Sequence, residues 1–179
     1  MGMLLFSITG ITLNHAADIP TTPRVATVEG ALPDAVRRVL GEPKAAPKGP
    51  VPTALAEWAR RELEVRLDGR EAEWNAGEIY VSLPRAGGDA WLTADLQTGE
   101  VRYELTDRGW IAYLNDLHKG RNSGSAWKWF IDLFAIASVV FTLTGLALLW
   151  FHAGGRPSTW PLVALGLVVP LLLAVLFVH

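Results

Sequence analysis

The residues best suited to chemistry in this chain are its four histidines, His15, His118, His152 and His179. Each lies at the end of an apolar segment, and residues 16–117, the polar middle of the chain, contain none. An imidazole at such a boundary is tolerated without any function, so a polar helix end is the simplest interpretation of any one of them. As a set they indicate metal ligation, because neutral imidazole is the commonest metal ligand among side chains.

His15 and His118 flank the polar middle and are expected at the same depth in a membrane. Two facing imidazoles suit the axial ligation of a b-type haem, which also needs an apolar slot and donors for its propionates. The sequence therefore predicts haem b on His15 and His118. The ring is expected among Phe6, Ile11, Phe130 and Phe134. Its propionates are expected on Lys119, Arg121 and Lys128.

A short motif occurs in two apolar segments. Residues 7–15 read Ser-Ile-Thr-Gly-Ile-Thr-Leu-Asn-His, and residues 142–145 read Thr-Leu-Thr-Gly, with His152 following. Glycine lets a macrocycle or another helix approach the backbone. Gly10 and Gly145 are therefore either cofactor-facing positions or helix-packing positions. His152 would belong to a second site, whereas His179 is expected to be incidental.

Long apolar segments must position these histidines. Leu133–Phe151 contains 19 residues without a formal charge, and Pro161–Val178 contains 18. At about 1.5 Å per residue, each spans close to the roughly 30 Å hydrocarbon core. Tryptophan, which favours the headgroup region, stands at their ends as Trp127, Trp129, Trp150 and Trp160. The sequence predicts an integral inner-membrane protein in contact with the lipid bilayer.

The first apolar segment, Met1–Leu13, is too short to span as a straight helix. It also lacks the basic start of a signal peptide. We therefore expect a partial membrane helix, either because its inner half is missing from this sequence or because it enters the bilayer only partway.

The polar middle predicts a small α+β domain with a sheet of three or four antiparallel strands. Helices are expected over 33–40 and 53–67, strands over 72–75, 78–83, 90–94 and 100–105, a hairpin turn over 95–99, and irregular chain over 18–27 and 42–52. Residues 16–118 carry 12 Lys/Arg and 17 Asp/Glu, a net charge of −5. That balance argues against nucleic-acid binding. The absence of cysteine excludes disulfides and thiolate ligands from this chain.

The expected organisation has six parts. They are a partial membrane helix (1–15), the α+β domain (16–106), an interfacial amphipathic helix and loop (107–125), a second membrane helix (126–152), a turn (153–159) and a third membrane helix (160–179). The turn carries Arg156 and no acid, so the positive-inside rule places it in the cytoplasm and the domain in the periplasm. Lys119, Arg121 and Lys128 weigh mildly against this orientation, unless a bound anionic group explains them.

Together these pieces resemble the PepSY-associated transmembrane family. The matching residues are Ser7–His15, Asp95–Val101, Leu117–Gly120, Trp129, Asp132–Leu133, Thr144–Leu146 and Leu149–Trp150. The resemblance implies a membrane α-helical fold, with two full and one partial transmembrane helices and an inserted, periplasmic PepSY-like α+β domain.

The resemblance also implies a function and its residues. Family members resemble inner-membrane haem-b reductases that move electrons across the membrane, some linked to iron uptake. His118 and His15 match positions implied to bind haem, and His152 matches an inner position. The His-Arg-Trp-like opening of the first helix is absent here, so a complete two-haem path is not implied.

The leading interpretation is a haem-b-type electron-transfer subunit that passes electrons between a membrane or cytoplasmic donor and a periplasmic acceptor. Its partners would be membrane or periplasmic redox proteins. The alternative is a non-catalytic accessory subunit that docks to a larger membrane complex through its helices and domain. A third interpretation is a regulator of a periplasmic enzyme. No catalytic residue set is recognised. The histidine placement favours the first interpretation, since an interaction module does not need imidazoles at both domain-side helix boundaries.

Overall fold

The computed structural model describes residues 2–41, 47–75, 77–152 and 154–178. The chain divides into two compact units, Met1–Trp129 and Phe130–His179. The first unit contains a sheet, two short helices that cover part of it, and the helices α1 (Gly2–Asn14) and α4 (Trp110–Lys119). The second unit consists of long apolar helices.

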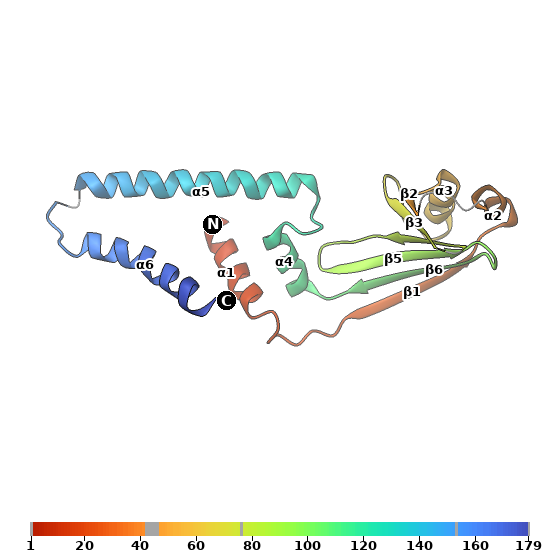
Figure 1. The fold of residues 1–179 in the computed structure, drawn as a ribbon, viewed down its shortest axis with the longest axis horizontal. Helices are drawn as coiled ribbons and strands as arrows, with labels where there is room; N and C mark the ends of the chain where they lie inside the picture. The colour runs from red at the N-terminus through yellow and green to blue at the C-terminus, as the bar shows by residue number, and fades with distance from the viewer. Residues whose placement is uncertain (1, 42–46, 76, 153, 179) are drawn as a thin grey trace. The chain divides into compact units, whose positions relative to one another are not determined.

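A six-stranded antiparallel sheet forms the centre of the first unit (Figure 1). Its strands are β1 (Arg24–Ala31), β2 (Lys48–Pro50), β3 (Glu71–Asn75), β4 (Glu78–Ser82), β5 (Gly88–Asp95) and β6 (Glu100–Asp107). They lie in the order β1-β6-β5-β4-β3-β2. Strands β3 to β6 follow one another as hairpins. Each of their connections contains a glycine with positive φ, namely Gly77, Gly87 and Gly99. Glycine suits these turns because residues with a side chain rarely adopt positive φ.

The hydrophobic core lies between one face of the sheet and the helices α2 (Asp34–Leu40) and α3 (Thr53–Glu62). Alternate residues of β5 are buried, as a half-covered strand requires. The largest fully buried side chains are Leu55, Leu67, Ile79, Leu92, Val81 and Val101. Helices α2 and α3 lie toward the end of the sheet where β1 ends, and α4 lies toward the opposite end (Figure 1).

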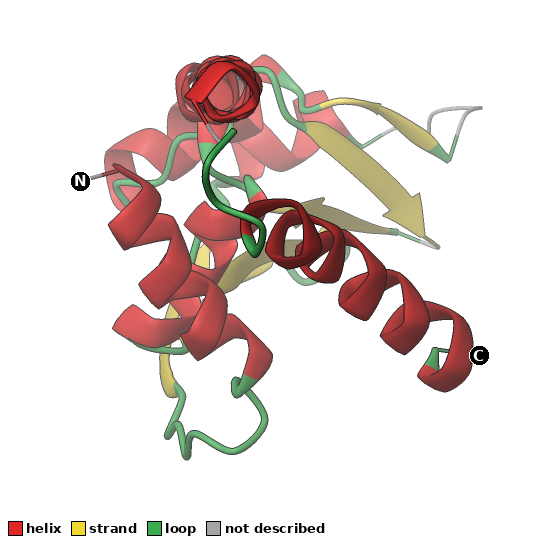
Figure 2. Cartoon of the chain, turned by 90° about the vertical axis from the view of Figure 1, so that its left-hand side faces the viewer, coloured by secondary structure: helices red, strands yellow, loops and turns green. Residues whose placement is uncertain are grey.

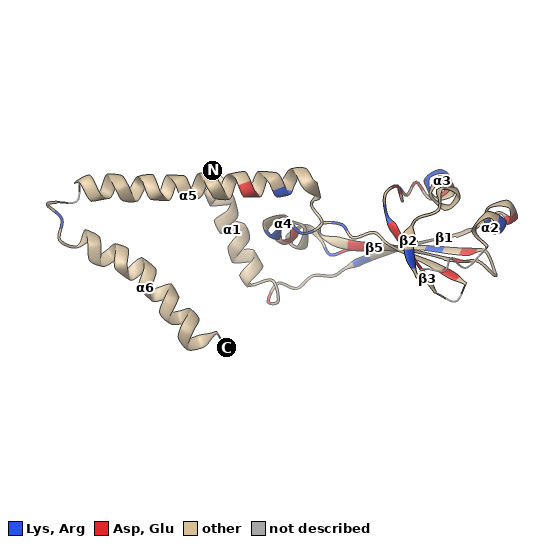
Figure 3. Ribbon diagram, turned by 45° about the horizontal axis from the view of Figure 1, so that its top comes forward, with Lys and Arg blue, Asp and Glu red and all other residues tan. Residues whose placement is uncertain are grey.

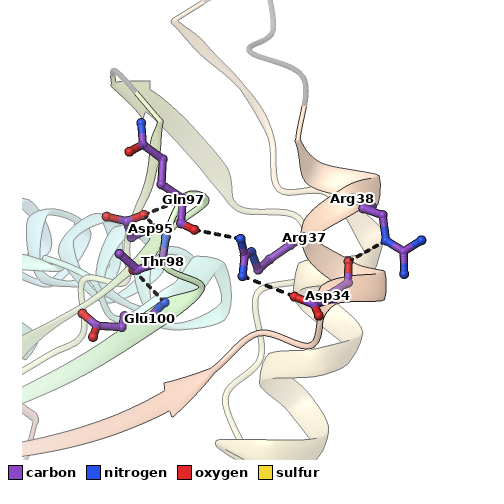
Figure 4. Close-up of polar contacts among 7 residues, drawn as sticks. All are labelled: Asp34, Arg37, Arg38, Asp95, Gln97, Thr98 and Glu100. Atoms are coloured by element: carbon purple, nitrogen blue, oxygen red, sulfur yellow. Dashed lines mark hydrogen bonds and ion pairs between the residues drawn. The ribbon is translucent and has the colours of Figure 1, made fainter.

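The β5–β6 turn also holds α2 in place (Figure 4). Asp95 Oδ1 accepts hydrogen bonds from the backbone N–H groups of Gln97 and Thr98 at 2.7 and 2.8 Å. These bonds, first that from Thr98 and then that from Gln97, lower the pKa of the Asp95 carboxyl. Arg37 Nη2 of α2 donates to the Gln97 carbonyl at 2.7 Å. The hydrogen bonds of this turn therefore stabilise the β5–β6 hairpin and also attach α2 to it.

Two secondary-structure predictions were wrong. The helix expected to reach Leu67 ends at Glu62, because Glu64 adopts φ +57° and the chain turns Leu67 into the core. The segments expected to be irregular include the first half of β1 and all of β2, and the sheet has six strands rather than three or four. Nearly every residue of β1 is exposed, which removes the apolar alternation that identifies a strand.

Two long helices carry the apolar segments. α5 (Gly124–His152) has 29 residues and includes an 18-residue stretch with a mean hydropathy of 2.2, and α6 (Thr159–Phe177) has 19 residues and includes such a stretch with a mean hydropathy of 2.5. No residue of either helix is buried. α6 has no charged residue, and α5 has its charges near its start (Figure 3). Both are long and apolar enough to cross a membrane, whereas α1 is a shorter apolar helix.

Candidate functional site

The predicted ligand His118 lies in a contact between α1 and α4. α1 presents Thr9 and Thr12, three residues apart, and α4 presents Asn115 and His118, also three residues apart. Thr9 Oγ1 lies 2.8 Å from His118 Nδ1, and Thr12 Oγ1 lies 3.2 Å from Asn115 Oδ1. Because residues three apart share a helix face, the two pairs form a polar ladder between antiparallel helices. Thr9 and Asn115 are 6% and 7% exposed.

The remaining neighbours of His118 are apolar. Its ring centroid lies 5.3 Å from that of Phe6. A Cβ added to Gly10 would lie 3.6 Å from His118 Cε1 and 4.0 Å from Nε2, so the glycine allows the imidazole to approach α1 closely. A cavity of about 40 Å³ adjoins the ring, and it is lined by Leu5, Phe6, Thr9, Leu114, Leu117, His118 and Trp127.

Thr9 binds the Nδ1 side of the His118 ring. The Thr9 hydroxyl also lies 3.0 Å from Leu5 O and 3.2 Å from Phe6 O of its own helix. Its single hydrogen goes either to one of these carbonyls, so that it accepts a bond from a protonated His118 Nδ1, or to Nδ1 itself, so that Nε2 carries the ring proton. In both tautomers Nε2 has no hydrogen-bond partner in the part of the chain that the structure describes.

The same helix is anchored to the sheet. Asp116 Oδ2 accepts a hydrogen bond from the Gly87 backbone N–H at 2.9 Å, and Asp116 is only 8% exposed. Gly87 has φ +76°, and a Cβ there would lie 2.8 Å from Tyr113 Cβ. α4 is thus held between α1 and the β4–β5 turn. Sequence reasoning named Asp116 as a candidate partner of a histidine ring, but it missed Asn115 and the anchoring of α4 by Asp116. Two adjacent polar residues within an apolar helix were a signal.

The structure does not bring His15 and His118 together. His15 Nδ1 lies 3.2 Å from Asp18 Oδ2, and its side chain is 60% exposed. His118 meets α1 at Thr9 and Gly10, and His15 follows Gly10 by five residues, which corresponds to about 7.5 Å along a helix axis. An iron shared by two imidazoles needs them on opposite sides of one metal, at about 2 Å each. The shared haem therefore remains a prediction.

The other predicted site residues lie apart from this contact. Lys119, Arg121 and Lys128 are exposed, and they form no ion pair with any other described residue. In the second unit, His152 Nδ1 lies 3.0 Å from the Leu148 carbonyl oxygen, and a Cβ at Gly145 would meet no atom within 4 Å. His179 lies outside the described residues. Of the predicted slot, Phe6 contacts His118, Ile11 is 65% exposed, and Phe130 stacks on Phe134.

As it stands, the contact does not fit a haem. The cavity of about 40 Å³ is far below the roughly 300–1,000 Å³ of ordinary ligand pockets. Among the described residues, no group of three or more His, Asp or Glu is placed to hold a metal ion. What the arrangement can do is fix α4 against α1 and leave one imidazole nitrogen without a hydrogen-bond partner among the described residues.

The chain belongs to the family described as "Putative PepSY_TM-like", whose model matches residues 1–179. The family predicted from the sequence is thereby confirmed. No curated protein and no solved structure matches the chain. The family and the two unburied apolar helices indicate a PepSY-associated membrane protein.

Proposed function

From its membership of this family, we propose that the chain is a non-catalytic accessory subunit of an inner-membrane complex. α5 and α6 anchor it in the bilayer, and the sheet domain lies in the periplasm, where it contacts a partner. The observation that supports this proposal best is strand β1, which pairs with β6 along one side only. The α4 contact supports it too, because the hydrogen bond to Thr9 gives His118 a structural role that needs no cofactor.

β1 offers a regular open edge of eight residues. Its register with β6 is unbroken from Arg24 to Ala31. Leu32 N–H continues this register by donating to Gly99 O at 2.8 Å. Since ladder bonds alternate, even-numbered residues of β1 face β6, and the N–H and C=O groups of residues 25, 27, 29 and 31 face the open edge. Such an edge is a template for pairing with another chain.

The occupant is an extended strand of a different subunit. β1 follows α1, so with α1 in the bilayer the strand runs away from the membrane. A second copy in the same membrane would run in the same direction, and it could not add the antiparallel strand that continues this sheet. The partner strand therefore belongs to another polypeptide and runs toward the membrane. Its side chains meet Val25 and Val28, which are 57% and 45% exposed.

A matched pair of proline variants tests this function. Thr27→Pro removes an N–H that faces the open edge, whereas Val28→Pro removes one that bonds to β6. The tagged chain is extracted in mild detergent and run on a native gel. We expect a complex larger than the monomer, which Thr27→Pro dissociates while its domain remains folded. Val28→Pro should lower the unfolding temperature instead. A wild-type chain that runs as a monomer would contradict the accessory role.

The haem-b electron-transfer function is the second candidate, and one observation favours it. The His118 Nε2 atom has no hydrogen-bond partner among the described residues and lies beside Gly10 and Phe6 in an apolar wall. Because the cavity beside it is too small for a haem, α1 and α4 would have to separate. His118 would then hold the haem, and Lys119 and Arg121 would hold its propionates. His15 is the predicted second ligand and would have to leave Asp18. Bound haem would supply one-electron transfer.

An absorption spectrum of the reduced, purified chain separates the two candidates. The accessory role predicts no haem band. The electron-transfer role predicts a low-spin b-type band that His118→Ala abolishes. In that case His15→Ala removes the band or makes it high-spin, and His179→Ala, a control at the chain end, leaves it unchanged.

The periplasmic position of the domain has its own test. A reporter that is active only in the cytoplasm, inserted at the β4–β5 turn near Gly87, should be inactive. The same reporter placed near Arg156 should be active. The reverse pattern would place the domain and its partner in the cytoplasm.

A further inference from the structure

A second cavity lies at the opposite end of α4 from His118. Its volume is about 360 Å³. Its walls are the α1–β1 connection, which has no regular secondary structure (Figure 2), the first residue of β1, and the chain from the end of β6 into α4. The lining residues include Thr21, Thr22, Arg24, Asp107, Arg108 and Trp110. All of them belong to the first unit.

Two guanidinium groups line this cavity. Arg24 is exposed and forms no ion pair among the residues that the structure describes. Arg108 Nη2 lies 3.1 Å from Asp89 Oδ2, but its Nε is buried and has no hydrogen-bond partner within the described ranges. A buried donor without an acceptor is unfavourable. An anion in the cavity would reach the exposed part of this guanidinium rather than the buried Nε, since the Arg108 side chain is 39% exposed.

Two carboxylates lie at the cavity. Asp107 lines the wall and is the cross-strand partner of Arg24, and its Oδ1 accepts the Gly109 N–H at 2.7 Å, a bond that leaves its negative charge in place. Asp89 is the partner of Arg108. The first turn of α4 adds partial positive charge, because its N-cap residue, Gly109, has no capping side chain. The hydroxyls of Thr21 and Thr22 add two further donors.

We propose that this cavity binds a phosphate group between Arg24 and Arg108. A guanidinium matches two phosphate oxygens with parallel N–H donors, which a lysine cannot do. The group is either the phosphodiester of an anionic phospholipid or a free phosphate ion. The cavity volume falls within the range of about 300–1,000 Å³ that is usual for small-molecule sites.

The lipid source rests on the proposed membrane anchoring. α1 exposes Leu4, Ile8 and Ile11 by 59%, 52% and 65%. With α1 in the bilayer, the cavity follows just beyond its end, at Asn14, which is the level of the headgroups. Trp110 lines the cavity and is 68% exposed, and indole favours that level. The free-phosphate source does not need the membrane.

The test uses the full chain in detergent and isothermal titration calorimetry. The probes are dioctanoylphosphatidylglycerol, inorganic phosphate and, as a zwitterionic control, dioctanoylphosphatidylcholine. We expect Arg24→Gln to weaken binding of the anionic probe by about tenfold or more, the effect of one lost charge-assisted hydrogen bond. Arg61→Gln, a matched change at an exposed arginine of α3, should leave binding unchanged. Arg24→Lys should fall between wild type and Arg24→Gln.

Each outcome decides the proposal. Binding of the anionic lipid that phosphate does not compete with assigns the site to a headgroup, and competition by phosphate assigns it to the free ion. No binding of either probe, or equal affinity in wild type and Arg24→Gln, overturns the site. If Arg24→Gln fails to fold, Arg24→Lys carries the test. The native-gel result is independent, so failure of the accessory role leaves these titrations unaffected.

Discussion

The Nδ1 atom of His118 on α4 lies 2.8 Å from the hydroxyl of Thr9 on α1, although 109 residues separate the two in sequence. This contact joins the first helix of the chain to the last element before α5. His118 therefore has a defined structural partner before any cofactor is considered.

Removal of the Thr9 hydroxyl tests this contact. Thr9→Val keeps the side-chain shape and leaves His118 Nδ1 without its hydrogen-bond partner. Because the ring is only partly buried, we expect a loss of about 1 kcal/mol in the free energy of unfolding. Thr142→Val is the matched control, since the Thr142 hydroxyl donates to Ser138 O of its own helix. Equal effects of the two changes on the thermal unfolding of the detergent-solubilised chain would contradict the finding.

Asp116 should slow amide hydrogen exchange at the β4–β5 turn. In Asp116→Ala, the Gly87 N–H loses the carboxylate that accepts it at 2.9 Å. We expect faster amide hydrogen exchange at Gly87, measured by mass spectrometry on peptides that contain it. Asp116→Asn keeps an acceptor oxygen and should stay near wild type. Unchanged protection in Asp116→Ala would mean that the turn does not depend on α4.

Gly87 should tolerate a side chain less well than another glycine with positive φ. An added Cβ would lie 2.8 Å from Tyr113 Cβ and 2.9 Å from Tyr113 Cα, whereas at Gly69, with φ +69°, it would meet nothing within 4 Å. Both alanine variants carry backbone strain, and only Gly87→Ala adds a clash. We expect Gly87→Ala to cost roughly 1–3 kcal/mol more than Gly69→Ala. Chemical denaturation of the two variants gives this difference directly.

The parts of the fold that the sequence predicted correctly are those with strong local patterns. Strands β4 and β5 alternate buried residues with more exposed ones, and glycines with positive φ mark the turns between β3 and β6. α5 and α6 are long and uniformly apolar. Each of these signals is contained within about ten to thirty residues, as a reading of hydrophobic periodicity requires.

The parts that escaped prediction depend on neighbours distant in sequence. β1 is an exposed edge strand, and only its pairing with β6 makes it a strand. His15 and His118 were expected at one depth because both bound the polar middle, and this stays a prediction. The position of His118 against α1 depends on the packing of α4, whose Asn115 meets Thr12 and whose His118 meets Thr9. The matching three-residue spacings on the two helices become informative only once the helices are known to touch.

The last prediction concerns how the stability of the folded state depends on pH at Asp95. The backbone N–H groups of Thr98 and Gln97 lower the pKa of the Asp95 carboxyl below its usual value, which is about 3.9 in an unfolded chain. A carboxyl with a lowered pKa stabilises the folded state above the unfolded pKa, and that stability is lost as the pH falls through the folded pKa. Asp95→Asn, which keeps the shape but not the charge, should therefore unfold more easily than wild type at neutral pH. As the pH falls from about 4 through the lower pKa of the folded state, the two unfolding temperatures should converge. The turn also receives Arg37, so hydrogen exchange in α2 should increase in parallel. A difference between the two proteins that stays constant from neutral to strongly acidic pH would show that the charge of Asp95 does not hold the turn.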